Sequence, residues 1–123
     1  MSTSQGVVFM LGELMKKHRE GRKISQRDVA NKLNYKNINF ISMIEKGATN
    51  IPLNRANDFV KAYELPEFFE LVIIKERHAD CWTGINRALI NNYSRKFTQH
   101  LKDVNEEVDT KYNDMLREYG ISQ

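Results

Sequence analysis

The chain has 123 residues, of which 41% are hydrophobic and 28% charged, and its formal net charge is +3. This length fits one compact domain, or a minimal domain with an extension, and the composition excludes a disordered or membrane-spanning chain. Its single cysteine, Cys81, excludes an intrachain disulfide and an all-cysteine metal site. The N-terminus lacks the basic region and the apolar core of a signal peptide, so we expect a cytoplasmic protein without a membrane segment.

The charge is unevenly distributed along the chain. Residues 1–63 contain eleven Lys and Arg against five Asp and Glu, whereas residues 64–123 contain eight against eleven. A basic first half is typical of a segment that meets a polyanion, although a chance excess on solvated helix faces would give the same count.

The hydrophobic pattern predicts an all-α fold, because apolar residues recur at helical spacing and β-branched residues do not alternate with polar ones. We expect helices at about 7–20, 26–33, from 37 or 38 to 46, and 53–63, and a fifth that opens at Pro66. Gly21 and Gly47 are expected to end the first and third of them. Residues 1–76 are therefore predicted to form a five-helix unit.

Local signals mark the second of these helices at both ends. Ser25 followed by Asp28 is a capping-box pattern, in which each side chain bonds the other residue's backbone N–H. Asn34 lies in the polar turn that follows and is suited to a left-handed conformation. Two short helices joined by a tight polar turn match the helix-turn-helix layout, but this geometry alone is not specific.

Residues 77–123 are predicted to be a helical dimerisation or interaction region. Apolar residues recur from Trp82 to Tyr119 with a mean spacing of 3.7 residues, which indicates one long amphipathic helix or two antiparallel helices broken near Asn91 and Asn92. A second copy of the chain would cover this stripe, and a hairpin packed back on residues 1–76 is the alternative. The expected interface of the homodimer consists of Trp82, Ile85, Leu89, Tyr93, Phe97, Leu101, Val104, Val108, Tyr112 and Met115.

The segment from Ser25 to Gly47 reads SQRDVANKLNYKNINFISMIEKG and resembles the phage repressor/Cro (Xre-type) helix-turn-helix family. Arg19 upstream and Ile51-Pro52 downstream extend the resemblance, which covers roughly residues 11–63. The stretch from Ala30 to Glu45 is one residue longer than the commonest family pattern, and Asn34 replaces the usual turn glycine. The resemblance implies a DNA-binding domain whose third helix enters the major groove.

Particular side chains suit contact with DNA. Gln26 can offer its amide and a free backbone N–H to a phosphate oxygen. Asn39 and Met43, four residues apart, share the helix face opposite Ile41 and Ile44, where asparagine can pair with adenine and methionine can contact a thymine methyl. Packing against Tyr35 or the following helix is the alternative role of Phe40. The expected DNA-binding residues are Gln26, Arg27, Lys36, Asn37, Asn39, Phe40, Ser42, Met43, Lys46 and Asn50, with Lys32 and Arg55 as weaker candidates.

Arg19 and Glu45 resemble the family's pair that ties the first helix to the end of the third. Such a buried pair fixes orientation but adds little net stability. We therefore expect Arg19 and Glu45 to have a structural role.

No feature of the sequence indicates an enzyme. His18, His78 and His100 lack metal-ligand spacing, and there is no Gly-rich phosphate loop or nucleophile motif. We expect no cofactor and no metal. The sequence predicts a homodimeric regulator of transcription, of the repressor type, that binds double-stranded DNA. The alternative is a protein-interaction module, such as an antitoxin or phage-encoded inhibitor, whose C-terminal helix binds another protein.

Overall fold

The computed structural model describes residues 3–92 and 95–121, with the side chains of residues 10–88, 96 and 98–121. All regular structure in this part of the chain is helical, which confirms the predicted all-α class. The elements in chain order are α1 (Thr3–Gly21), α2 (Gln26–Lys32), α3 (Asn39–Glu45), the 3-10 turn η1 (Leu53–Arg55), α4 (Ala56–Ala62), α5 (Phe69–Arg77), α6 (Ala79–Asn92) and α7 (Arg95–Glu118). None of the described helices has the length and apolar content needed to span a bilayer.

Three helices start later than the sequence predicts. α3 begins at Asn39, because Asn37 and Ile38 belong to the preceding turn. The expected helix over residues 53–63 is divided into η1 and α4. Pro66 opens a turn of i to i+3 hydrogen bonds, the first of them from Phe69 N to Pro66 O at 2.9 Å, and α5 follows that turn.

Five of the helices end in the same type of cap. A residue with φ between 55° and 76° follows each helix, and the next backbone N–H bonds to the carbonyl five residues before it. This is the Schellman arrangement, which satisfies carbonyls at the helix end. The left-handed residues are Lys23, Asn34, Gly47, Glu64 and Gly120. The predictions for Asn34 and for a cap at Gly47 are thus confirmed.

One hydrophobic core joins the N-terminal helices to the end of the chain. Its largest fully buried side chains include Tyr63, Phe59 and Phe69. Gly12 lets α1 approach α3 closely, because a Cβ at this position would lie 2.6 Å from the carbonyl oxygens of Ile44 and Glu45. The backbone of α3 therefore lies directly against α1.

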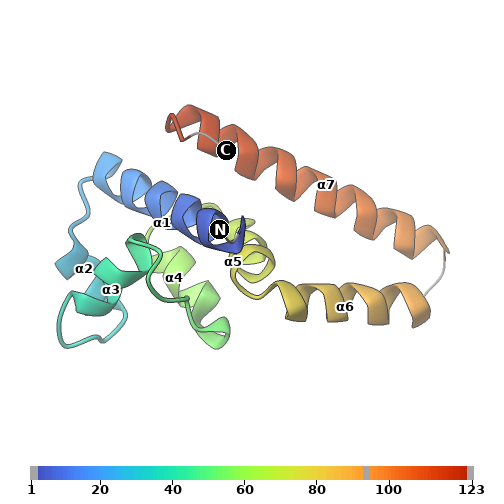
Figure 1. Ribbon diagram of the computed structural model, residues 1–123, viewed down its shortest axis with the longest axis horizontal. Helices are drawn as coiled ribbons and strands as arrows, with labels where there is room; N and C mark the ends of the chain where they lie inside the picture. Colours follow the sequence, from blue (N-terminus) through green and yellow to red (C-terminus); the bar gives the residue numbers. More distant parts are fainter. Residues whose placement is uncertain (1–2, 93–94, 122–123) are drawn as a thin grey trace.

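The C-terminal region forms two helices that extend as a hairpin away from α2 and α3, and α7 then returns over α5 towards α1 (Figure 1). Tyr112 packs edge-on against Phe69, with ring centroids 5.9 Å apart. Lys17 Nζ donates to the Tyr119 carbonyl at 3.0 Å, which ties the end of α7 to α1. The hairpin alternative therefore describes this region better than one long helix.

This arrangement corrects part of the expected dimer interface. Val108 and Tyr112 are buried in the core of their own chain, so they are not available to a second copy. Val104 and Met115 pack against the same core and are partly buried. Among the other expected interface residues, Trp82 and Leu101 are half-buried and Ile85 is exposed. The side chains of Leu89, Tyr93 and Phe97 lie outside the described residues.

Candidate nucleic-acid interface

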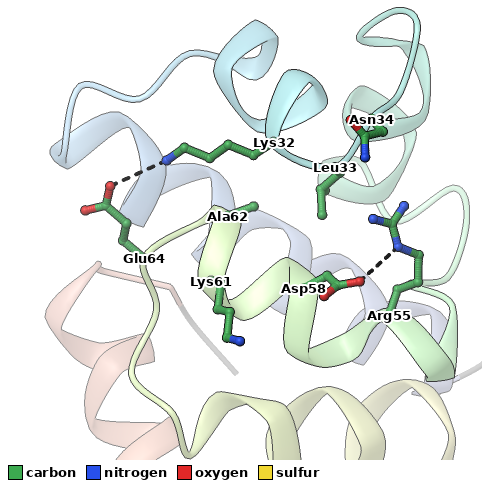
Figure 2. A pocket seen from close by; sticks show the side chains of 8 residues that line it. All are labelled: Lys32, Leu33, Asn34, Arg55, Asp58, Lys61, Ala62 and Glu64. Carbon is green, nitrogen blue, oxygen red and sulfur yellow. Dashed lines mark hydrogen bonds and ion pairs between the residues drawn. The ribbon is translucent and has the colours of Figure 1, made fainter.

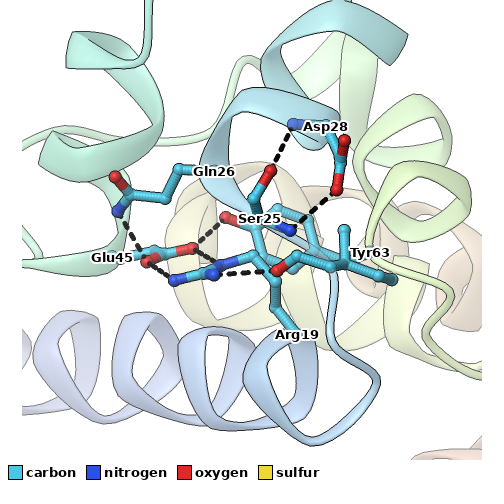
Figure 3. A network of polar contacts seen from close by, with 7 residues as sticks. Arg19, Ser25, Gln26, Asp28, Glu45 and Tyr63 are labelled. Carbon is cyan, nitrogen blue, oxygen red and sulfur yellow. Dashed lines mark hydrogen bonds and ion pairs between the residues drawn. The ribbon is translucent and has the colours of Figure 1, made fainter.

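The start of α2 is fixed by the predicted capping box. Ser25 Oγ accepts a hydrogen bond from Asp28 N at 3.0 Å, and Asp28 Oδ2 accepts one from Ser25 N at 2.9 Å (Figure 3). The hydrogen bonds to Ser25 lower the pKa of the Asp28 carboxyl. The two side chains satisfy backbone donors at the helix start and set the direction in which α2 leaves the preceding loop.

A side-chain hydrogen bond also forms just before the start of α3. Asn37 Oδ1 accepts from Asn39 N at 3.0 Å, while Ile38 at the cap position makes no side-chain bond of its own. Asn37 thus closes a local turn of the kind that asparagine favours. Its side chain is exposed just before the helix.

A buried polar network holds the inward side of α3. Glu45 Oε2 accepts from Arg19 Nε at 2.8 Å and from the Tyr63 hydroxyl at 2.6 Å, while Glu45 Oε1 accepts from Arg19 Nη2 at 3.0 Å (Figure 3). The hydrogen bond to Glu45 raises the pKa of the Arg19 guanidinium, and burial raises the pKa of the Tyr63 phenol. Arg19 and Glu45 are therefore paired as expected, and the neutral phenol is a further donor.

Gln26 belongs to the same network. Its Nε2 donates to Glu45 Oε1 at 3.0 Å, and the residue is half-buried. The amide of Gln26 therefore points towards Glu45, and the expectation that it faces a phosphate is corrected. The backbone N–H of Gln26 lies in the first turn of α2, where N–H groups have no acceptor within the helix.

The opposite side of α3 is open to solvent. Ile41 and Ile44 are fully buried, whereas Asn39 is exposed and Met43 keeps 44% of its surface accessible. A methionine this exposed contributes little to the core, and an exposed apolar side chain beside an amide can meet both polar and methyl groups of a base pair. Asn39 and Met43 thus lie on the outward face that their spacing predicts.

The remaining predicted residues divide between this face and the protein interior. Phe40 is half-buried with its ring 5.1 Å from that of Tyr35, so the packing role is the one that the structure contains. Ser42 is also half-buried. Exposed positions are occupied by Arg27, Lys36, Lys46 and Asn50.

The chain segment that contains α2 and α3 is basic. Residues 22–57 include seven Lys and Arg but only two acidic residues, Asp28 and Glu45. Asp28 is engaged in the capping box, and Glu45 is buried behind α3. No acidic side chain of α3 itself is therefore exposed to repel a phosphate backbone.

Two side chains at the end of α5 form hydrogen bonds to the backbone of the loop that follows α3. Arg77 Nη1 donates to the Thr49 carbonyl at 3.0 Å, and His78 Nε2 donates to the Ile51 carbonyl at 2.8 Å. Burial lowers the pKa of the Arg77 guanidinium to about 10. The exposed Asn50 lies between the two anchored carbonyls, so its backbone is fixed on both sides.

A hollow of about 470 Å³ lies between the end of α2 and α4 (Figure 2). Lys32 Nζ lies 3.7 Å from a Glu64 carboxylate oxygen, and Arg55 Nε lies 3.2 Å from Asp58 Oδ2. Arg55 also stacks over the Tyr35 ring at 5.2 Å. Because nearby carboxylates already pair with both cations, Lys32 and Arg55 are less available to an anion than the exposed Lys36 and Lys46.

Sequence reasoning missed several residues that position this surface. Tyr63 and the two loop anchors, Arg77 and His78, bond to partners 18 to 28 residues away, and no local pattern marks such contacts. Gly12 did carry a signal, because a glycine inside a helix often marks a close approach of another backbone.

No protein-family model matches the chain, and neither does any curated protein or solved structure.

Proposed function

We propose that this protein is a sequence-specific double-stranded DNA-binding regulator of transcription, of the repressor type, that acts as a homodimer. α3 enters the major groove with Asn39 and Met43 towards the base edges. Lys36, Lys46, Asn50 and the start of α2 contact the phosphates. The resemblance of residues 11–63 to the Xre-type family supports the same function.

The observation that carries this proposal is the division of α3 into two sides. The inward side is immobilised by Ile41, Ile44 and the four hydrogen bonds on Glu45. A rigid helix that exposes an amide and a thioether can read bases without first having to be ordered, which lowers the entropic cost of binding.

The test begins with selection of duplexes from a random pool by the purified full chain. A palindromic consensus is expected, because a two-fold symmetric dimer reads two equivalent half-sites. Affinity for that consensus should fall steeply as salt is raised, since bound Lys and Arg release counterions from the phosphates. No enrichment, together with a stable complex between the hairpin and another protein, would replace this proposal with the protein-interaction alternative.

Asn39→Ala tests the base reader directly. The variant should lose about 1–3 kcal/mol of binding free energy on the selected site and little on random duplex. Asn57→Ala is the matched control, because its exposed amide donates to Glu70 Oε2 on α5, and it should bind as the wild type does. Equal losses on both duplexes would show that Asn39 does not read sequence.

A further inference from the structure

We propose that two copies of this chain associate through the outer face of α6, packed antiparallel about Gly84. The outer face of α6 comprises Cys81, Gly84, Ile85 and Ala88, bordered along one edge by Asp80 and Arg87. The proposal names the contact surface of the homodimer and rests on that part of the proposed function. It does not depend on which DNA the protein reads.

The residues of this face lie on one side of α6 because they are three or four positions apart. All four are exposed, and Ile85 has 54% of its surface accessible. α6 makes its intrachain contacts elsewhere: Trp82 and Asn86 are half-buried, and Asn86 Oδ1 accepts from Asn105 Nδ2 of α7 at 3.3 Å. In the part of the chain that the structure describes, the outer face of α6 is therefore exposed to solvent.

Gly84 is the first indication of what packs against the outer face of α6. It stands in the interior of a 14-residue helix, where glycine is the poorest helix former after proline. A Cβ at Gly84 would meet nothing within 4 Å, whereas a Cβ at Gly12 would strike the backbone of α3. Gly12 thus serves packing inside the chain. Packing among the described residues gives no reason for Gly84, but close approach of a helix from another chain would.

The bordering charges identify that helix as a second α6. Asp80 and Arg87 are both exposed, lie two helical turns apart on the same edge, and have no ion-pair partner among the described residues. An antiparallel copy crossing near Gly84 brings each Asp80 beside the other chain's Arg87, and places Cys81 opposite Ala88. In a parallel two-fold pair the two charged edges would lie on opposite sides of the contact, so neither Asp80 would meet an Arg87. The edge is therefore complementary to itself, as a two-fold interface requires.

Charge exchange tests the pairing by sedimentation equilibrium of the full chain. Asp80→Arg and Arg87→Asp should each weaken dimerisation by about tenfold or more, because each places like charges in contact. The double variant should recover an affinity near that of the wild type. Lys102→Asp, an exposed charge reversal on α7, is the control and should leave dimerisation unchanged. Single variants that dimerise as the wild type does would overturn the proposal.

Gly84→Ala should raise the unfolding temperature and at the same time weaken dimerisation. At a concentration where the wild type is monomeric, the variant should unfold at a temperature higher by on the order of 4 °C, because alanine favours the helix. Its dimerisation should nevertheless weaken by about tenfold, since the added methyl separates the crossing helices. Higher melting temperature with unchanged dimerisation would show that nothing packs on Gly84.

The outcomes separate this surface from the proposed function. If the wild type is a dimer that none of these variants weakens, the outer face of α6 is the wrong surface and the homodimer stands. If the wild type is a monomer both alone and on its selected duplex, the surface and the homodimer fail together. Selection of a DNA consensus is judged independently of either result.

Discussion

The two sides of α3 are held in different ways. Ile44 and Glu45 are buried, and Glu45 is bonded to α1, to α2 and to the residue that follows α4, whereas Asn39 and Met43 face solvent. One side fixes where the helix lies, so the other can be occupied by whatever side chains a ligand requires. Substitutions on the two sides should therefore change different measurements, stability on one side and binding on the other.

The largest loss of stability is expected from Arg19→Met. The substitution keeps much of the side-chain volume but leaves the buried Glu45 carboxylate without its cation, which should lower the free energy of unfolding by about 3–5 kcal/mol. Urea unfolding followed by circular dichroism measures the change. Lys16→Met, an exposed position on the same helix, should change stability by less than about 0.5 kcal/mol. A loss of under about 1 kcal/mol for Arg19→Met would contradict the importance of the inward network.

A smaller loss is expected from Gly12→Ala. The new methyl would lie 2.6 Å from two carbonyl oxygens at the end of α3, so α1 and α3 must move apart at a cost of about 1–3 kcal/mol. Gly21→Ala is the control, because a Cβ there meets nothing within 4 Å. If both variants unfold at the same urea concentration, Gly12 does not set the distance between the helices.

The smallest effect on stability is expected on the outward side. Asn39→Ala and Met43→Ala remove exposed atoms and should each change the free energy of unfolding by less than about 0.5 kcal/mol. The same urea titrations provide the measurement. A loss above about 1 kcal/mol in either variant would mean that this side also supports the fold, and any loss of DNA binding would then need another explanation.

The parts of the fold that the sequence predicted correctly depend on neighbouring residues. The capping box needs only Ser25 and Asp28, and the left-handed turn needs only Asn34. The inward position of Ile41 and Ile44 follows from helical spacing alone. These signals act over three to four residues, so they are present in the sequence whatever the rest of the chain does.

The parts that were missed depend on contacts between distant residues. The spacing of Val108 and Tyr112 predicts an apolar face, but the same spacing would serve a helix packing on its own chain or on another. The position of Gln26 at a helix start was predicted, yet its partner Glu45 lies 19 residues away. Periodicity identifies which side of a helix is covered and does not identify the covering element.

The hydrogen bonds of Arg77 and His78 have a consequence for signal transmission. These two residues end α5 where the hairpin departs, and their bonds hold the carbonyls on either side of Asn50. If the hairpin pivots at this point, it must stretch or break a bond to that loop. A load on α6 or α7 would therefore reach the backbone on either side of Asn50 through these two hydrogen bonds.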